Sequence, residues 1–280
     1  MAVIQPIIFT DMDGSLLDHD TYSHAEADEL LEWLGDKKIP VVPATSKTRA
    51  EVLKLRAQLN NTHPFIIENG AAIFTPLNYF SHDYMNDNVH DDYHVKAFVE
   101  SRSHWQSLLK QSEVHLNEAF LSFADAGVAG VKDMTGLSLE EARLASQREY
   151  GEPLKWLGSD DLLNEFDQYI SLHGGQLLRG GRFVHVSGPC DKGHALKWLF
   201  ANFQQQYCDK KTVSIAIGDS HNDVAMLEAA DYAIIIRSPV HEFPMLADNV
   251  NQQVVMTDQV GPRGWVEGVS YVLKGLGFHN

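Results

Sequence analysis

The chain has 280 residues, enough for one large domain or two smaller ones. With 44% hydrophobic and 21% charged residues, its composition is that of a folded globular protein and excludes a disordered one. The net charge of −16 argues against nucleic acid or an anionic membrane as a partner, although a local cation can still hold an anionic substrate.

Strand and helix patterns alternate along the first 75 residues. Short apolar runs predict strands at 7–10, 39–44 and 65–67. Two capping-box sequences, Ser23–Glu26 and Thr48–Glu51, predict the starts of the helices between them. Alternation of this kind predicts a parallel sheet with crossover helices, which is an α/β architecture.

The stretch from 84 to 187 has a different pattern. A third capping box, Ser138–Glu141, opens one helix, and an apolar face over 162–170 predicts another. Two extended runs on either side of Gly180 and Gly181 predict a hairpin. We therefore expect an α+β domain at 84–187, inserted between two halves of one core domain, 1–83 and 188–280.

The last 90 residues return to the first pattern. Helices are predicted at 192–203 and 222–229, and strands at 213–217 and 232–236. These elements extend the parallel sheet that begins in the first 75 residues.

An acidic segment, Asp11-Met12-Asp13-Gly14-Ser15, directly follows the first predicted strand. In open parallel sheets, ligands bind at the carboxyl ends of the strands. Two carboxylates so close together repel unless a cation lies near them, and Gly14 permits a tight turn. One carboxylate would then attack phosphorus while the other transfers protons. Taken alone, the segment also suits an Asx-rich turn that caps a helix.

A second acidic segment, Gly218-Asp219-Ser220-His221-Asn222-Asp223, lies at another predicted strand end. Asp219 and Asp223 would complete an oxygen-ligand site for Mg²⁺ together with the first pair. N-capping by Asp219 or Asn222 is the alternative. Acidic pairs at two separate strand ends favour the metal site.

Two further segments contain groups that suit a phosphate. Thr45, in Ala44-Thr45-Ser46-Lys47, places a hydroxyl between a strand end and a helix start, although Ser and Thr also commonly cap helices. Lys192, in Asp191-Lys192-Gly193, lies in the first turn of a predicted helix. If it is only a surface residue, its positive charge opposes the dipole of that helix. If it binds a phosphate, a lysine at this position is useful. Both interpretations of Lys192 remain open at this point.

The compartment is predicted from the termini and the cysteines. The N-terminus has no cationic start or cleavage site, and no apolar run approaches the ~20 residues that cross a bilayer. Cys190 and Cys208 are too few for a disulfide framework. We expect a cytoplasmic protein with no membrane partner.

The four segments, in this order and with an insertion, resemble the haloacid dehalogenase (HAD) superfamily of phosphatases, and the insertion point resembles that of its C2-type cap domains. Further segments resemble one branch, the mannosyl-3-phosphoglycerate phosphatase family; they are 44–48, 68–71, 147–153, 179–186 and 218–223. The resemblance implies a Rossmann-like HAD core with an inserted α+β cap. Ser15 departs from the superfamily, which usually has Thr there, but a hydroxyl is retained.

By this resemblance, Asp11 attacks phosphorus and forms an aspartyl-phosphate. Asp13 protonates the leaving alkoxide and then activates the hydrolytic water. The implied cofactor is Mg²⁺, which would be held by Asp11, Asp219 and the main-chain carbonyl of Asp13, with Asp223 ordering metal-bound waters. Thr45 and Lys192 would hold the transferring oxygens.

The resemblance also implies the substrate, mannosyl-3-phosphoglycerate, a small anionic sugar phosphate. Guanidinium groups bind carboxylates bidentately, so cap arginines are candidates for its carboxylate, although most surface arginines are solvated or paired. Glu149, Glu152 and His185 are candidates for its sugar hydroxyls. The expected substrate-binding residues are Ser46, Lys47, Asn69, Arg148, Glu149, Arg179, Gly180, Gly181, Arg182 and Asn222.

Three other functions stay open on the sequence. Glucosyl-3-phosphoglycerate or a broader range of sugar phosphates would need changes only in the cap. A phosphotransferase or mutase of the superfamily would use the same core, and a non-catalytic sugar-phosphate sensor would not need both Asp11 and Asp13. The oligomeric state is not predicted.

Overall fold

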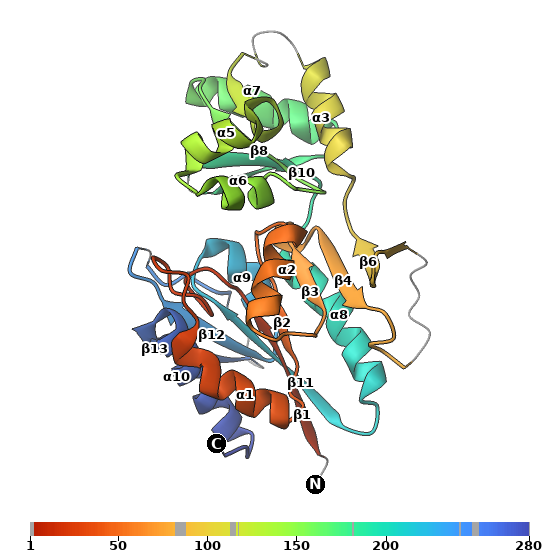
Figure 1. Ribbon diagram of the computed structural model, residues 1–280, viewed down its shortest axis with the longest axis vertical. Coiled ribbons are helices and arrows are strands. Elements are labelled where there is room, and N and C mark those ends of the chain that lie inside the picture. Colours follow the sequence, from red (N-terminus) through yellow and green to blue (C-terminus); the bar gives the residue numbers. More distant parts are fainter. Residues whose placement is uncertain are drawn as a thin grey trace. The chain divides into compact units, whose positions relative to one another are not determined.

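The computed structural model describes residues 3–81, 88–112, 116, 118–180, 182–240, 242–247 and 252–279. The chain divides into two compact units, drawn in Figure 1. The first consists of Met1–Thr45, Gln58–Lys96 and Asp191–Asn280, and the second of Ser46–Ala57 and Ala97–Cys190. The first unit is thus assembled from segments far apart in the sequence.

A five-stranded parallel sheet forms the centre of the first unit. Its strand order is β13-β12-β11-β1-β2, and each neighbouring pair runs parallel. The parallel sheet predicted from the sequence is confirmed, and the apolar run within β1 is completely buried. The strands are β1 (Ile4–Thr10), β2 (Val41–Pro43), β11 (Lys211–Gly218), β12 (Tyr232–Arg237) and β13 (Gln253–Val260).

Helices pack on this sheet. The C-terminal helix α10 contacts β12 and β13, whereas α8 contacts β1, β11 and the short helix α9. A Cβ on Gly193 would lie 2.1 Å from the carbonyl oxygen of Ala225, so a glycine is needed where α8 meets α9. The helical elements are η1 (Ala25–Ala27), α1 (Asp28–Asp36), α8 (Lys192–Gln206), η3 (His221–Asp223), α9 (Val224–Ala229) and α10 (Gly261–Gly275).

A second, antiparallel sheet adjoins the parallel one in the first unit. Its strand order is β3-β4-β6-β5, and a parallel bridge between Ala44 and Ile66 connects it to the end of β2. The predicted strand at 65–67 is confirmed as β3. The elements are β3 (Phe65–Ile67), η2 (Glu68–Gly70), β4 (Ala72–Pro76), β5 (Val89–His90) and β6 (Tyr93–Ala97).

The second unit is an α+β module, as predicted for the middle of the chain. Its four-stranded sheet has the order β7-β8-β10-β9. The predicted hairpin is confirmed, because β9 pairs antiparallel with β10 and Gly180 lies opposite Phe183. Gly181 lies outside the described residues. The elements are α2 (Arg49–Gln58), α3 (Arg102–Gln111), β7 (Phe120–Ser122), α5 (Phe123–Thr135), α6 (Leu139–Ala145), β8 (Glu152–Trp156), α7 (Asp160–Leu172), β9 (Gln176–Gly180) and β10 (Phe183–Ser187).

Two of the three predicted capping boxes form. At the start of α2, the Thr48 amide donates to the Glu51 carboxylate at 2.8 Å, and the Glu51 amide donates back to the Thr48 hydroxyl at 3.2 Å. Ser138 and Glu141 make the same reciprocal pair before α6. Each box satisfies two amide groups that the helix start would otherwise leave unpaired.

The capping box predicted at Ser23–Glu26 is wrong. The chain enters this helix through the 3₁₀ turn η1, whose N-cap is His24 without a side-chain cap. The Ser23 hydroxyl accepts instead from the amide of Ala25 at 3.3 Å. A 3₁₀ turn has three residues per turn, so it changes the spacing on which the box depends.

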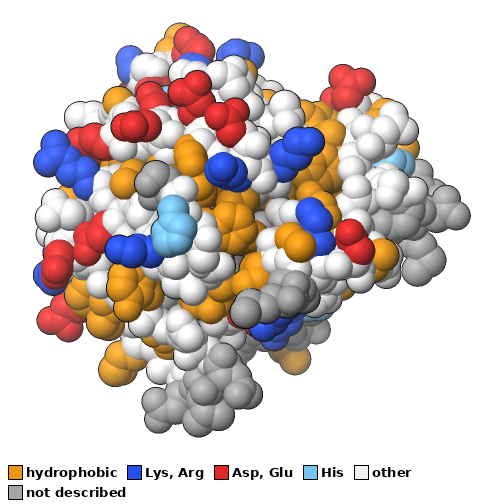
Figure 2. Space-filling view, turned by 90° about the horizontal axis from the view of Figure 1, so that it is seen from below, with side chains coloured by type: hydrophobic (Ala, Val, Ile, Leu, Met, Phe, Trp, Pro, Cys, Tyr) orange, Lys and Arg blue, Asp and Glu red, His pale blue; other side chains and the backbone are white. Residues whose placement is uncertain are grey.

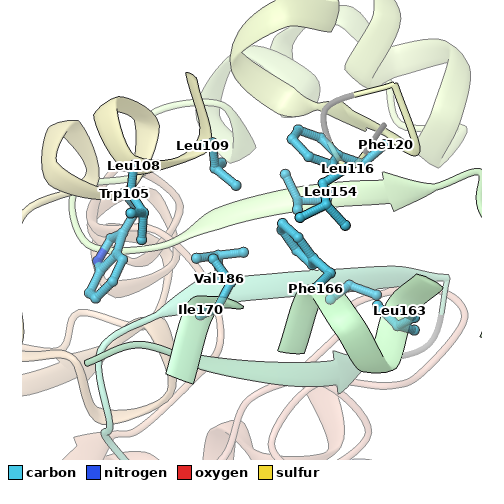
Figure 3. Packing of buried hydrophobic residues seen from close by; sticks show 11 residues of the cluster. Trp105, Leu108, Leu109, Leu116, Phe120, Leu154, Leu163, Phe166, Ile170 and Val186 are labelled. Carbon is cyan, nitrogen blue, oxygen red and sulfur yellow. The ribbon is translucent and has the colours of Figure 1, made fainter. Parts of the chain in front are cut away.

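An apolar cluster joins α3 and α7 to the sheet of the second unit (Figure 3). In that view Phe166 of α7 points toward Leu154 of β8, and both side chains are completely buried. Burial of each large apolar side chain stabilises the unit by about 1.5–3 kcal/mol. The buried members are Trp105, Leu108, Leu109, Leu116, Phe120, Leu154, Leu163, Phe166, Ile170, Val184 and Val186.

A buried ion pair ties the start of β8 to α3. The Glu152 side chain is 0% exposed and accepts from Arg102 Nε at 2.5 Å, from Arg102 Nη2 at 3.1 Å and from Gln106 Nε2 at 3.0 Å. It also accepts from the amide of Ala124 at 2.9 Å. These contacts give Glu152 a structural role in place of the predicted contact with sugar hydroxyls.

We expect Glu152→Ala to lower the free energy of unfolding by about 3 kcal/mol or more, because Arg102 would keep a largely buried charge without its partner. Urea unfolding followed by tryptophan fluorescence measures this, with the exposed Glu118→Gln as control. The double variant Arg102→Met, Glu152→Leu should recover part of the loss. A single-variant change within about 0.5 kcal/mol of wild type, the range of ordinary surface changes, would contradict this role.

The surface combines charges of both signs. Figure 2 shows acidic, basic and hydrophobic side chains interspersed on one face, so the net negative charge does not make that face uniformly acidic. Within the part of the chain that the structure covers, no helix is both long and apolar enough to span a bilayer.

Candidate active site

The two acidic segments meet at the carboxyl end of the parallel sheet. Strands β1 and β11 are neighbours, with Thr10 opposite Ile217, and the Asp11 amide donates to the Ile217 carbonyl at 2.8 Å. Gly14 has φ +76°, and a Cβ there would lie 2.7 Å from Asp219 Oδ2. Only a glycine therefore lets the turn after β1 lie against the Asp219 carboxylate.

Three carboxylates form a buried cluster at this point. One ligand atom from each of Asp11, Asp219 and Asp223 lies within 4.8 Å of the others. Their residues are 5%, 5% and 0% exposed. Mg²⁺ prefers hard oxygen ligands from carboxylates, so this donor set fits the predicted metal. The structure thus brings together the residues predicted from two distant strand ends.

Lys192 extends into the same cluster. Its side chain is 0% exposed, and Nζ lies 2.5 Å from Asp11 Oδ1 and 2.6 Å from Asp223 Oδ1. Asp191 caps α8 by accepting from the amide of His194 at 2.7 Å. A Cβ on Gly70 would lie 2.1 Å from the Asp191 carbonyl oxygen, so η2 packs closely on the start of α8. This cap and packing fix the position of Lys192.

Burial disfavours the ionised form of Asp11 in this cluster. Burial raises the pKa of Asp11 well above its ordinary value; Lys192 opposes this shift, and Asp223 and Asp13 add to it. Burial alone would lower the pKa of Lys192, but Asp11 and Asp223 outweigh it and raise that pKa, so the ammonium stays charged. A divalent cation beside three carboxylates and one ammonium would favour ionised Asp11.

Asp223 is fixed by the backbone of its own segment. Its Oδ2 accepts from the amides of Asp219 and Ser220, both at 3.2 Å. Ser220 and Asp223 form a capping box at η3, which the usual sequence pattern does not predict because Asp, rather than Glu or Gln, occupies the third helical position. One carboxylate oxygen of Asp223 therefore accepts from backbone amides, and the other accepts from Lys192.

Asp13 lies on the turn that follows Asp11. The Leu17 amide donates to the Met12 carbonyl at 2.8 Å, and the Gly14 amide donates to the Leu17 carbonyl at 2.9 Å. The turn leaves Asp13 half-buried, and its carboxylate is not a member of the three-residue cluster found among the described residues. This exposure suits a group that exchanges protons with a ligand.

Thr45 and Asn69 are held together beyond the end of β2. The Thr45 amide donates to the Ile66 carbonyl at 3.1 Å, and the Thr45 carbonyl accepts from the Asn69 amide at 3.0 Å. Asn69 has φ +59°, a left-handed conformation that Asn tolerates better than most residues. Its Oδ1 accepts from Asn222 Nδ2 at 3.3 Å, so two predicted substrate-binding residues are in contact.

A sequence profile of the haloacid dehalogenase-like hydrolases matches residues 8–125 and 180–254. The chain belongs to this family. The matched residues include the turn after β1, Thr45, Lys192 and both acids of the second segment. The resemblance predicted from the sequence motifs is confirmed.

Two curated relatives identify the branch of the HAD family. Proteins from Methanococcoides burtonii and Persephonella marina are both named glucosyl-3-phosphoglycerate/mannosyl-3-phosphoglycerate phosphatase. The first is 35% identical over 260 residues, covering 92% of this chain and 94% of the relative. The second is 30% identical over 273 residues, covering 96% and 97%. The chain belongs with these HAD phosphatases, and by family it is a phosphomonoester hydrolase.

Solved structures share the HAD fold at low identity. The sucrose-phosphatase of Synechocystis, solved with sucrose and phosphate, matches 96% of this chain and 98% of its own, with 15% identity and a TM-score of 0.57. A HAD-superfamily phosphatase of Bacteroides thetaiotaomicron matches 98% and 96%, with 17% identity and a TM-score of 0.62. The predicted fold, a HAD core with an α+β module, is confirmed.

The other residues predicted to bind substrate in this HAD hydrolase lie in the second unit. Arg148 is half-buried, and its Nη2 donates to the Ser46 carbonyl at 3.2 Å. Glu149 pairs with Arg49, whose Nε lies 2.6 Å from Glu149 Oε1. Lys47 is half-buried beside Ser46 in the sequence. Arg49 was not predicted, because nothing in the sequence links it to a residue 100 positions away.

The two hairpin arginines are exposed. Arg179 on β9 is 63% exposed and lies 3.9 Å from Asp160, a separation at which an exposed pair contributes little. Arg182 Nη2 donates to the Thr135 carbonyl at the end of α5 at 2.8 Å, and its guanidinium lies over the Phe183 ring. Arg182 is thereby oriented, whereas Arg179 has more freedom.

His185 on β10 is held in its neutral form. Burial, and then the positive charge of Arg148, lower its pKa to about 3. The unfolded chain therefore binds a proton at His185 more readily than the folded one. Its contribution to stability is present above the ordinary histidine pKa and is lost as the pH falls toward about 3.

We expect the free energy of unfolding of wild type to fall, relative to His185→Gln, by up to about 1.4 kcal/mol per pH unit below the ordinary histidine pKa of about 6.5. Carboxylates also titrate in this range, but they do so in both proteins. Their effect therefore cancels in the difference between the free energies of unfolding of wild type and His185→Gln. Urea unfolding over a pH series measures it. Parallel pH dependences of the two proteins would contradict the shifted pKa.

Proposed function

We propose that the protein is a Mg²⁺-dependent phosphatase that forms an aspartyl-phosphate on Asp11 and hydrolyses mannosyl-3-phosphoglycerate to mannosylglycerate and phosphate. The observation that carries this proposal is the buried Lys192 ammonium between Asp11 and Asp223, next to the three-carboxylate cluster. Non-catalytic binding of an anion would not need so many buried acids. This arrangement disfavours the alternative of a sugar-phosphate sensor.

The metal would be held by Asp11, Asp219 and the main-chain carbonyl of Asp13, with Asp223 in support. When bound, Mg²⁺ supplies positive charge against the phosphate dianion and the developing transition state. Asp219 is suited to this role because its carboxylate already lies against Gly14 in the turn that carries Asp13.

The chain's own residues divide the chemistry between them. An Asp11 oxygen attacks phosphorus, the bond from phosphorus to the substrate alkoxide breaks, and Asp13 gives that alkoxide its proton. Asp13 then takes a proton from a water that attacks the same phosphorus, which releases phosphate and restores the Asp11 carboxylate. Lys192 orients Asp11 and stabilises the charge on the transferring oxygens.

The residues around this centre would hold the phosphoryl group. Thr45 is buried beyond β2, and its hydroxyl suits a phosphoryl oxygen. Asn69 and Asn222, which contact each other, would position that group from the neighbouring segments.

Residues 84–187 would form the cap that selects the substrate. Arg148, Arg179 and Arg182 supply guanidinium groups for the glycerate carboxylate, and the backbone at Gly180 and Gly181 would add amide donors. Ser46, Lys47 and Glu149 would contact the remaining polar groups. The names of both relatives include the mannosyl and glucosyl esters, which supports this substrate class and keeps glucosyl-3-phosphoglycerate as the alternative.

We propose a cytoplasmic location. Both cysteines are free thiols in the structure, as a reducing compartment requires.

Phosphate release over a small substrate panel tests this proposal. We expect turnover of mannosyl-3-phosphoglycerate with Mg²⁺ and only background release with a chelator. Mannose 6-phosphate, which lacks the glycerate carboxylate, should be turned over less well. Equal turnover of all sugar phosphates would indicate a broad phosphatase, and phosphorylated product in place of free phosphate would indicate a phosphotransferase. Tight binding without release would indicate a sensor.

Arg148→Ala sharpens the test of the carboxylate contact. We expect KM for mannosyl-3-phosphoglycerate to rise about tenfold or more, the cost of losing a charge-assisted hydrogen bond. The KM for mannose 6-phosphate should change little. Equal effects on both substrates would assign Arg148 to another role.

A further inference from the structure

The side chain of Trp265 connects the C-terminal helix to the residue before Asp11. Trp265 lies on α10 and is 0% exposed, and its indole Nε1 donates to the Thr10 hydroxyl at 3.0 Å. Thr10 is the last residue of β1 and is also 0% exposed. Its hydroxyl donates to the main-chain carbonyl of Asp11 at 2.7 Å. A buried chain of two hydrogen bonds thus runs from α10 to the backbone of Asp11.

The direction of this chain is fixed by its chemistry. An indole N–H can only donate, so the Thr10 hydroxyl oxygen is the acceptor of the first bond. A hydroxyl carries a single proton, and the Asp11 carbonyl receives it. Trp265 therefore stabilises the rotamer of Thr10 in which the hydroxyl contacts Asp11.

Two glycines allow Trp265 to reach the centre of the sheet. Gly264 and Gly268 are four residues apart, so they lie on one face of α10. A Cβ on Gly264 would lie 2.3 Å from the Gln259 carbonyl oxygen, and a Cβ on Gly268 would lie 2.3 Å from Ile234 Cγ2. A larger residue at either position would push α10 away from β12 or β13. Close packing of α10 is therefore what lets the indole contact the end of β1.

Asp11 is held at three points, and the chain from Trp265 supplies one of them. The Asp11 amide donates to the Ile217 carbonyl at 2.8 Å, and Lys192 Nζ lies 2.5 Å from Asp11 Oδ1. The third point is the Asp11 carbonyl. Bonds to its amide and its carbonyl fix the peptide groups on both sides of the Asp11 Cα, which sets the direction of its side chain. A reacting group must be held within about 0.5 Å and 10–20° of its productive geometry.

We propose that Trp265, acting through Thr10, is a positioning residue for Asp11. The inference rests on the proposed function, in which an Asp11 oxygen attacks phosphorus. Trp265 holds the Thr10 hydroxyl, and that hydroxyl holds the backbone from which the Asp11 carboxylate projects. The family profile ends at residue 254, so this contribution of α10 lies outside the matched residues.

Trp265→Phe removes the indole N–H and keeps an aromatic ring. We expect kcat for mannosyl-3-phosphoglycerate to fall about tenfold, as for one lost hydrogen bond, while KM changes by less than about twofold. The matched control is Trp105→Phe, because Trp105 is 1% exposed and its N–H has no partner among the described residues. Both substitutions leave a cavity, but only the first should lower kcat.

Substitutions of Thr10 test the same chain without a large cavity. Thr10→Val keeps the shape but not the hydroxyl and should lower kcat about tenfold, whereas Thr10→Ser keeps the hydroxyl and should retain most of the kcat. The double variant Thr10→Val, Trp265→Phe should have the kcat of Thr10→Val alone, because both residues act through one chain. Independent effects would multiply to about a hundredfold.

The inference is overturned if folded Trp265→Phe keeps the kcat of wild type, or if Thr10→Ser loses as much as Thr10→Val. It is also overturned if the two losses multiply in the double variant. If Trp265→Phe does not fold, the two Thr10 variants decide.

The failure of the proposed function gives a different result. Wild type would then release no phosphate from any ester of the panel, and a Mg²⁺ titration of the thermal unfolding midpoint would decide the inference instead. We expect Thr10→Val to need about tenfold more Mg²⁺ than wild type for the same rise in the midpoint, because Asp11 is one of the expected ligands. No difference between Thr10→Val and wild type in this titration would overturn the positioning role.

Discussion

Asp11→Asn is expected to reduce phosphate release from mannosyl-3-phosphoglycerate by about 10⁴-fold or more, as for removal of a nucleophile. The amide has nearly the shape of the carboxylate but cannot attack phosphorus. Burial already raises the pKa of the Asp11 carboxyl group, so its ionised form is disfavoured in the folded protein. We therefore expect the neutral amide to cause no loss in the free energy of unfolding. Steady-state phosphate release and thermal unfolding, measured on the same preparation, check both parts.

The matched control for Asp11→Asn is Asp20→Asn, an exposed acid that lies further along the chain, outside the acidic segment, and this variant should keep wild-type activity. Mass spectrometry should confirm that the introduced side-chain amide has not deamidated back to aspartate. Activity near that of wild type in intact Asp11→Asn would rule out Asp11 as the nucleophile.

Lys192→Ala is expected to lower kcat by about 10²–10³-fold, the cost of removing one preorganised donor to transition-state charge. It should also lower the free energy of unfolding by about 3 kcal/mol or more in the absence of metal, because Asp11 and Asp223 would lose their buried partner. Lys197→Ala, an exposed lysine on the same helix, is the control for both measurements.

A double variant separates the two effects of Lys192. Lys192→Ala with Asp223→Asn removes one of the two stranded carboxylates, so it should recover stability without recovering turnover. Recovery of both would mean that Lys192 acts only by stabilising the fold. If Lys192→Ala keeps both the kcat and the free energy of unfolding of wild type, the placement of Lys192 between the two acids is contradicted.

Much of the core could be predicted because it depends on local patterns. The apolar run of β1 is buried on both faces, and two capping boxes match the helix starts that they predicted. Strand β13 could not be predicted in this way, because seven of its eight residues are exposed or half-buried and its apolar residues do not alternate. Its place in the sheet comes from pairing with β12 and packing of α10.

The candidate site was predictable to the extent that strand ends converge. Asp11 and Asp219 follow neighbouring parallel strands, so topology alone brings them together. The contact of Lys192 with Asp223 depends on how α8 packs on η2 and α9, which no local pattern specifies. The same holds for Glu152, whose partner Arg102 lies 50 residues away.

The central claim is that Asp11 is transiently phosphorylated. Enzyme mixed with mannosyl-3-phosphoglycerate and Mg²⁺, quenched in acid within one turnover and digested, can be mapped by mass spectrometry. We predict one added phosphoryl group on the peptide that contains Asp11, which disappears in Asp11→Asn. Full turnover of substrate with no phosphorylated peptide, at any quench time, would contradict the account.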